Sequence, residues 1–211
     1  MNSSYYDQDY YERGVESGKS CYQNYTYLPE LTIPMAMTIV DFLGIKPGQL
    51  VLDYGCAKGY LVKALRLLNR ESWGAEISNY ALANVHPDVK PYCNRPSFYE
   101  KQFKTVFDFC IAKDVFEHIP QNELKETIHK ISANTLFAII PLGKKGKFFA
   151  KSNDFDKSHV ICEDEDWWDA FLSSNGWRMS SFKYQVKGIK DNYSGIPKAH
   201  GFFVLRRKEC L

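Results

Sequence analysis

Two acidic residues, each close to the end of an apolar segment, occupy the positions in this sequence that most clearly indicate ligand binding. Asp53 lies in VLDYGCAKG, where a short apolar run leads into a turn that contains Gly55 and Gly59. Glycine permits a tight turn and the close approach of a ligand to the backbone. Glu76 ends the next apolar segment, WGAE. If both segments are parallel strands, the two acids meet at the sheet edge where open α/β folds bind ligands.

The residues around Asp53 indicate which class of ligand this edge would bind. The loop lacks the G-K-[ST] ending of a P-loop, and its G-x-x-x-G spacing differs from the dinucleotide fingerprint G-x-G-x-x-G. An acid here would repel phosphates, but it suits a cation such as the α-ammonium of a methionine moiety. The carboxylate of Glu76 can accept hydrogen bonds from both ribose hydroxyls. These features disfavour a nicotinamide dehydrogenase. The alternative to ligand binding is that both acids serve as helix caps or lie in the first turn of a helix.

A second group of residues has the types needed for base catalysis or metal binding. Asp114, Glu117 and His118 are spaced i, i+3 and i+4, which would place them on one face of a helical turn. His159 follows a later apolar segment, and we expect it on the same side of the sheet. Either histidine can act as a general base, because its ordinary pKa is near neutrality. The four side chains together can hold a divalent ion such as Mg²⁺ or Mn²⁺; the alternative is a metal-free turn with structural histidines.

Alternating strand and helix patterns predict the elements that position these residues. A mostly parallel, Rossmann-like, doubly wound α/β sheet is expected, because short apolar runs alternate with helical periodicity. Two final strands without a clear helix between them predict an antiparallel edge strand. The expected strands are residues 49–54, 73–76, 89–93, 107–112, 135–140, 182–186 and 201–206, and the expected helices are 30–43, 60–68, 81–84, 122–131 and 164–175.

Residues 1–44 are expected to form an N-terminal, aromatic-rich helical cap within the same domain as a core of residues 45–211. Seven tyrosines crowd the start of this cap: Tyr5, Tyr6, Tyr10, Tyr11, Tyr22, Tyr25 and Tyr27. Tyrosine has an apolar face and a polar tip, so the cap either only packs on the core or also stacks on a sugar or base.

Composition limits the classes of function. The chain has 211 residues and a net charge of +2, so a nucleic-acid partner is not expected. Its six cysteines form no C-x-x-C pair, which indicates a reduced protein without a disulfide framework or zinc site. No apolar stretch approaches the ~18 residues of a membrane span, and the polar N-terminus does not resemble a signal peptide. We expect a cytoplasmic protein, and the oligomeric state stays open.

Four stretches in the expected order resemble the class I S-adenosylmethionine (SAM)-dependent methyltransferases, in particular the type 11 group. They are VLDYGCAKGY, WGAEIS, FDFCIAKDVFEHIP and HVICEDEDWWDAFLSSNGW, and the resemblance covers roughly residues 45–185. It implies SAM as cofactor, with Glu76 on the ribose and Ile77 beside the adenine. The other implied contacts are Asp53, Gly55, Cys56, Ala57 and Gly59 on the methionine and ribose side, Asn94 on the adenine, and the backbone of Ala112 and Lys113.

The resemblance and the two histidines together predict an O-methyltransferase that acts on a hydroxyl of a sugar, a glycan or a small molecule, with His118 and His159 as candidate catalytic residues. One alternative is a metal-assisted RNA 2′-O-methyltransferase. The D-x-x-E-H sequence at Asp114 with a distant histidine resembles the metal-binding E-x-x-E-H of small-RNA terminal 2′-O-methyltransferases. Another is a non-catalytic SAM-fold binding protein. No N-P-P-Y or D-P-P-Y sequence follows the fourth strand, which disfavours N-methylation of that type.

Overall fold

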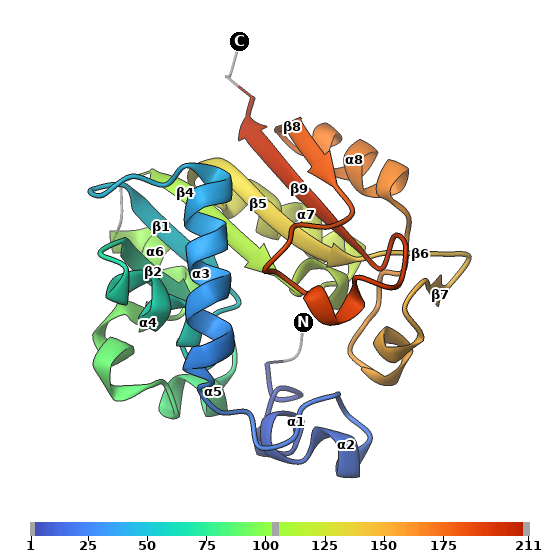
Figure 1. Ribbon diagram of the computed structural model, residues 1–211, viewed down its shortest axis with the longest axis horizontal. Coiled ribbons are helices and arrows are strands. Elements are labelled where there is room, and N and C mark those ends of the chain that lie inside the picture. Colours follow the sequence, from blue (N-terminus) through green and yellow to red (C-terminus); the bar gives the residue numbers. More distant parts are fainter. Residues whose placement is uncertain (1–2, 103–105, 209–211) are drawn as a thin grey trace.

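A central sheet organises the computed structural model, which describes residues 3–102 and 106–208 (Figure 1). The described residues form a seven-stranded sheet with the strand order β3-β2-β1-β4-β5-β9-β8. The strands are β1 Leu50–Tyr54, β2 Glu71–Ala75, β3 Cys93–Asn94, β4 Phe107–Lys113, β5 Ala133–Pro141, β8 Trp177–Lys183 and β9 His200–Arg207. Strands β3, β2, β1, β4 and β5 pair in parallel, so the predicted mostly parallel sheet is confirmed.

Helices cover both faces of the sheet, as a doubly wound fold requires. They are α1 Gln8–Glu12, α2 Gly14–Ser17, α3 Pro29–Leu43, α4 Tyr60–Leu67, α5 Asn79–Ala83, α6 Pro96–Gln102, α7 Gln121–Lys130 and α8 Glu165–Ser174. The 3₁₀ helices are η1 Pro87–Tyr92, η2 Phe116–His118, η3 Lys151–Phe155 and η4 Asp191–Tyr193, and a small hairpin joins β6 Gly143–Lys144 to β7 Lys147–Phe148. No described helix is long and apolar enough to cross a membrane.

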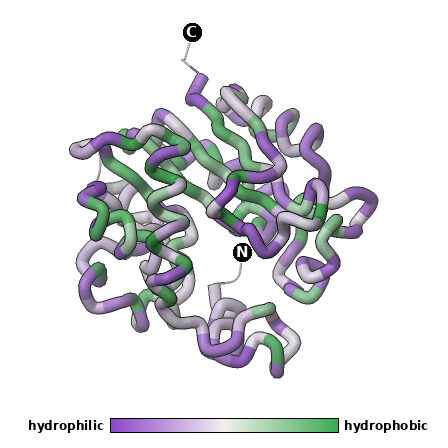
Figure 2. The backbone as a smooth tube through the Cα atoms, in the orientation of Figure 1, coloured by the Kyte–Doolittle hydropathy of each residue, from purple (hydrophilic) through white to green (hydrophobic). Residues whose placement is uncertain are grey.

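The two apolar layers follow from the residues that each strand turns to its two faces. One layer packs α3 and α4 against the sheet, and the other packs α7 and α8 against the opposite face. Strands β4 and β5 are buried along most of their length, and the chain in Figure 2 is correspondingly apolar through the centre of the sheet. A strand buried on both faces has a continuous apolar sequence rather than an alternating one.

The two closing strands lie at one edge of the sheet, where the sequence predicted an antiparallel addition. Strand β9 is inserted between β5 and β8 and runs antiparallel to both, so β8 is the antiparallel edge strand. Burial explains this order. Residues 200–205 of β9 are buried, whereas most of β8 is partly or fully exposed, so β8 takes the edge.

The third strand is shorter than predicted. Residues 87–92, most of which we expected in a strand, form η1, and only Cys93 and Asn94 pair with β2. Pro87 and Pro91 explain the difference, because proline has no N–H to donate to a strand ladder.

Candidate active site

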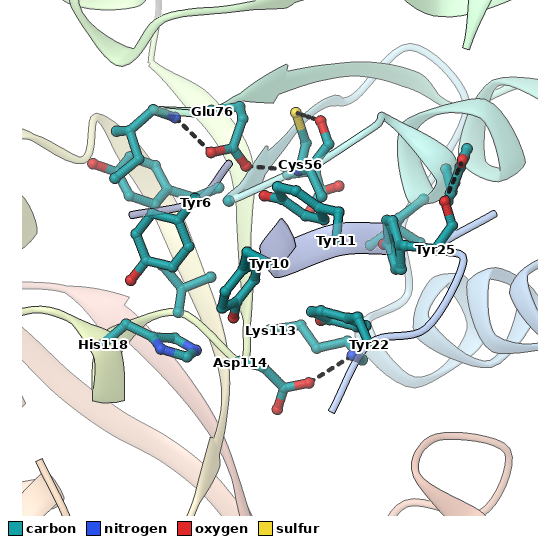
Figure 3. Close-up of a pocket in the computed structure, with 18 of the residues that line it drawn as sticks. Tyr6, Tyr10, Tyr11, Tyr22, Tyr25, Cys56, Glu76, Lys113, Asp114 and His118 are labelled. Carbon is teal, nitrogen blue, oxygen red and sulfur yellow. Dashed lines mark hydrogen bonds and ion pairs between the residues drawn. The ribbon is translucent and has the colours of Figure 1, made fainter. Parts of the chain in front are cut away.

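A cavity of about 600 Å³ lies at the carboxyl ends of β1, β2 and β4 (Figure 3). The N-terminal segment of residues 5–28, which includes α1 and α2, contributes a large part of its wall. Five tyrosine rings from this segment line the cavity: Tyr6, Tyr10, Tyr11, Tyr22 and Tyr25. Among the expected cofactor contacts, Asp53, Gly55, Cys56, Ala57, Glu76, Ile77 and Lys113 line it as well. The structure therefore brings most of them together in one pocket.

Asp53 is a buried acid that faces this cavity. It lies in β1, its side chain is only 5% exposed, and within the described residues no hydrogen bond reaches its carboxylate. Burial raises its pKa to about 7, although the nearby charge of Lys113 acts in the opposite direction. A cationic group bound beside Asp53 would favour its ionised form.

Glu76 joins the two loops that border the pocket. Its Oε2 accepts a hydrogen bond from the backbone N–H of Ala57 at 2.8 Å, and its Oε1 accepts from those of Ile77 and Ser78 at 2.7 Å each. Burial still raises its pKa, against the opposing effect of these three donors. A carboxylate can accept about four hydrogen bonds, so Glu76 retains capacity for about one more donor.

The glycine loop after β1 depends on the absence of a side chain at one position. Gly55 has a φ of +83°, and a Cβ atom there would lie 2.5 Å from Cγ2 of Val115. Both features require glycine. The backbone N–H groups of Gly55 and Cys56 donate to the carbonyl oxygen of Ala75, which ties the loop to β2.

Three of the expected cofactor contacts do not line the cavity, namely Gly59, Asn94 and Ala112. Gly59 is the N-cap of α4 with a φ of +77°, so its conformation shapes the loop. The carbonyl oxygen of Asn94 accepts from the backbone N–H of Glu76, and Pro96 contributes to the wall in its place. Sequence reasoning did not select Val115, Ile119, Glu123 or Thr127, which also line the cavity.

Of the four residues that the sequence predicted to form one cluster, Asp114 is not grouped with the other three in the described structure. Its carboxylate forms ion pairs with Lys113 at 2.7 Å and Lys190 at 2.5 Å, which hold its pKa well below the usual range despite its burial. The prediction assumed a helical turn. Asp114 instead has a φ of +55° and precedes η2, so its side chain points elsewhere.

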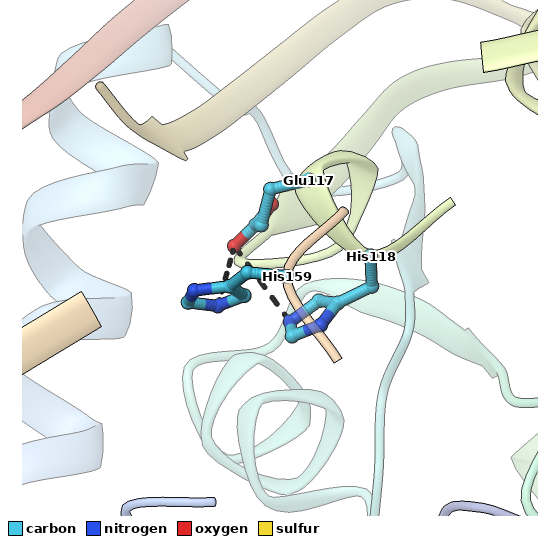
Figure 4. Close-up of side chains that lie close together, drawn as sticks. All are labelled: Glu117, His118 and His159. Carbon is cyan, nitrogen blue, oxygen red and sulfur yellow. Dashed lines mark ion pairs between the residues drawn. The ribbon is translucent and has the colours of Figure 1, made fainter. Parts of the chain in front are cut away.

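The remaining three residues do converge (Figure 4). One ligand atom from each of Glu117, His118 and His159 lies within 4.8 Å of the other two, and this is the one such group found among the described residues. Oε1 of Glu117 is 3.8 Å from Nε2 of His118 and 3.9 Å from Nε2 of His159. Glu117 is fully buried, and neither carboxylate oxygen has a hydrogen-bond partner in the described structure. Burial, reinforced by Asp114, raises its pKa well above the usual range.

The two histidines are held by their other ring nitrogens. Nδ1 of His118 is 2.8 Å from Oγ of Ser158, and Nδ1 of His159 is 2.7 Å from the carbonyl oxygen of Asn153. Burial lowers the pKa of His118 to about 4, so its imidazole is neutral at physiological pH. His118 lines the cavity, whereas His159 is not among the residues that line it. The triad of Glu117, His118 and His159 therefore adjoins the pocket through His118.

A sequence comparison identifies the family to which this chain belongs. A family model described as a methyltransferase domain matches residues 33–140, just over half of the chain. A search of curated proteins found no match.

Solved structures share the fold. Magnesium protoporphyrin IX methyltransferase from Synechocystis PCC 6803, solved with bound SAH, is 15% identical with a TM-score of 0.60, and the match covers 99% of this chain and 100% of that one. Mitomycin 7-O-methyltransferase MmcR is 14% identical with a TM-score of 0.60 over 92% of this chain, which spans 65% of MmcR. A SAM-dependent methyltransferase from Archaeoglobus fulgidus is 13% identical with a TM-score of 0.62, and the match covers 85% of this chain and 97% of that one. The chain belongs to the methyltransferase-domain family and is a SAM-dependent methyltransferase.

Proposed function

We propose that this enzyme transfers the methyl group of SAM to a hydroxyl of a sugar or another small molecule, beside a divalent ion held by Glu117, His118 and His159. The observation that carries the proposal is the convergence of one carboxylate and two imidazoles against the wall of the cofactor pocket. When bound, SAM supplies a methyl group on a positively charged sulfur atom, and this sulfur, as a neutral thioether, is a good leaving group.

The pocket residues fit SAM. Asp53 offers a buried carboxylate that has no hydrogen-bond partner among the described residues and is suited to the α-ammonium group of the methionine moiety. Glu76 has capacity for about one further donor, such as a ribose hydroxyl. Gly55 lines the same pocket, and because it has no side chain its backbone can be approached closely by a ligand.

The triad fits a divalent transition-metal ion better than Mg²⁺. Two imidazole nitrogens and one carboxylate oxygen suit ions such as Mn²⁺ or Zn²⁺, whereas Mg²⁺ prefers an all-oxygen set. Both Nδ1 atoms already have partners, so each histidine turns Nε2 toward Glu117. Such an ion supplies Lewis-acid chemistry, which lowers the pKa of a hydroxyl.

The cavity wall supports a small acceptor with a flat or ring-shaped body. The rings of Tyr6, Tyr10 and Tyr22 lie on the same pocket as His118 (Figure 3). Tyrosine rings stack on sugar rings and flat molecules, and the cavity volume of about 600 Å³ suits ligands of small-molecule size. Without a bound ion, neutral His118 can accept a proton at Nε2, but a pKa of about 4 makes it a weak base.

The experiment is a methyl-transfer assay with labelled SAM and a panel of free sugars, nucleotide sugars, phenols and a short RNA. Transfer to a hydroxyl should be lost in EDTA and restored by Mn²⁺. Glu117→Gln should abolish it, whereas Glu126→Gln, an exposed carboxylate on α7, should not. Transfer that persists fully in EDTA would remove the metal from the proposal, and exclusive transfer to nitrogen or carbon would refute O-methylation.

RNA is a second candidate acceptor, because the same triad would serve the 2′-hydroxyl at an RNA end. The separation of Asp114 from the triad and the net charge of +2 count against it. Transfer to the RNA oligonucleotide, with binding that weakens steeply as salt rises, would favour this candidate over a sugar.

A further inference from the structure

A chain of hydrogen bonds leads from the N-terminal segment to His118. The hydroxyl of Tyr10, in α1, donates to Oδ2 of Asp156 at 3.0 Å. The other carboxylate oxygen of Asp156 accepts from Oγ of Ser158 at 2.5 Å and from the backbone N–H of Ser158 at 2.9 Å. Oγ of Ser158 in turn lies 2.8 Å from Nδ1 of His118. Four residues from three separate parts of the chain are thus linked.

The chemistry of these groups fixes the direction of the bonds. A carboxylate only accepts hydrogen bonds, so the single hydroxyl proton of Ser158 points to Asp156. The serine oxygen must then accept from Nδ1–H of His118. The proton of neutral His118 therefore lies on Nδ1, and Nε2 keeps its lone pair for the triad. The proton of neutral His159 also lies on Nδ1, because the carbonyl oxygen of Asn153 beside that nitrogen can only accept a hydrogen bond.

The link depends on docking of the N-terminal segment. The backbone N–H of Lys157 donates to the carbonyl oxygen of Lys19 at 3.2 Å, beside the contact between Tyr10 and Asp156. The ring of Tyr6 packs edge-on against the imidazole of His118, with centroids 6.1 Å apart. Tyr10 is buried, which raises its pKa well above the ordinary value, so its hydroxyl remains a donor. The segment that closes the cofactor pocket therefore also contacts the loop that orients His118.

We propose that Asp156 and Ser158 are positioning residues that hold the proton of His118 on Nδ1, and that Tyr10 makes this arrangement depend on the docked N-terminal segment. The inference rests on the proposed function, in which Nε2 of His118 is a metal ligand. Groups that orient a metal-binding histidine through its second nitrogen typically change metal affinity or activity by roughly 10- to 100-fold.

The test reads the tautomer of His118 directly. Long-range ¹H–¹⁵N NMR spectra of the full chain separate protonated from unprotonated ring nitrogens, and His118→Gln identifies the signal. In the metal-free wild type, Nδ1 of His118 should carry the proton. Asp156→Asn and Ser158→Ala should shift the proton toward Nε2 and weaken Mn²⁺ binding roughly 10- to 100-fold. Ser158→Thr, which keeps the hydroxyl, should restore both, so a folding defect in one variant does not decide the result.

Two matched controls isolate the chain of hydrogen bonds. Asp154→Asn changes an exposed carboxylate in η3, two residues before Asp156. Tyr5→Phe removes a hydroxyl that bonds within the N-terminal segment itself, to the carbonyl oxygen of Lys19. Neither should alter the tautomer, whereas Tyr10→Phe should produce a mixture of both forms. The proposal is overturned if wild-type His118 carries its proton on Nε2, or if the Asp156 and Ser158 variants leave the tautomer unchanged. Because the NMR readout needs neither SAM nor an acceptor, its result stands whether or not O-methylation is observed.

Discussion

Replacement of Asp53 by Asn should weaken cofactor binding and at the same time stabilise the ligand-free protein. Burial raises the pKa of Asp53 from 3.8 to about 7. Because the unfolded chain keeps the lower value, ionising this carboxylate in the folded protein costs about 4 kcal/mol. The wild type bears this cost at neutral pH, and the D53N variant does not.

The sign of the pH dependence follows from the two pKa values. The folded-state pKa of Asp53 lies above the unfolded-state value, so the stability linked to its protonation is complete below about pH 4 and is lost as the pH rises toward 7. The free energies of unfolding of D53N and wild type should therefore be similar near pH 4 and diverge above it. At pH 8, D53N should be more stable by up to about 4 kcal/mol in urea denaturation. Asp41→Asn, on the exposed face of α3, is the control for loss of a charge.

Cofactor binding should change in the opposite direction. A hydrogen bond between the ammonium group of S-adenosylhomocysteine and the ionised carboxylate is worth about 1.5–3 kcal/mol, so D53N should weaken its binding roughly 10- to 100-fold in calorimetric titration. Binding to the wild type should also weaken as the pH falls below 7. The reasoning is refuted if D53N binds S-adenosylhomocysteine as tightly as the wild type, or if it is less stable than the wild type at pH 8.

Three further substitutions test other parts of the site. Gly55→Ala would place a Cβ atom 2.5 Å from Val115, whereas at Gly48, which has the same φ of +83°, an added Cβ would meet no atom within 4 Å. Gly55→Ala should therefore lower the melting temperature and the affinity for S-adenosylhomocysteine more than Gly48→Ala does. Equal losses in the two variants would contradict the steric argument. Glu76→Gln replaces one carboxylate oxygen by an NH₂ group that cannot accept a hydrogen bond, so at least one of the three backbone N–H donors loses its acceptor. The variant should be less stable by about 1–3 kcal/mol and should bind S-adenosylhomocysteine more weakly in the same titration. Wild-type affinity would exclude Glu76 from the cofactor site. Burial raises the pKa of Glu117, so the stability linked to its protonation is lost as the pH rises above 4.5. In EDTA, the melting temperature of Glu117→Gln should therefore exceed that of the wild type at pH 8 but not at pH 4, and added Mn²⁺ should make the wild type the more stable protein at pH 8. Identical melting temperatures would argue against a buried ionisable carboxyl.

The sequence predicts the sheet and the cofactor edge because their signals are local. Asp53 and Glu76 each lie close to the end of a short apolar strand, and parallel pairing of β1 with β2 brings those ends together. The order of the last two strands is not local: β8 and β9 are both plausible edge strands until their burial is known.

The candidate active site was only partly predictable. Spacing alone grouped Asp114 with Glu117 and His118, but the positive φ of Asp114 and its ion pair with Lys190, from a distant loop, separate it from them. The hydrogen bonds from Tyr10 through Asp156 to His118 join residues more than a hundred positions apart, and no pattern in the sequence indicates such a link.

The most direct test of the account is a crystal structure of the protein with S-adenosylhomocysteine and Mn²⁺, with anomalous diffraction recorded at the manganese edge. S-adenosylhomocysteine should lie in the pocket between Asp53 and Glu76, and one anomalous peak should lie within bonding distance of Glu117, His118 and His159. S-adenosylhomocysteine bound elsewhere would contradict the assigned cofactor site. An ordered cofactor without a peak at the triad would contradict the metal-assisted mechanism.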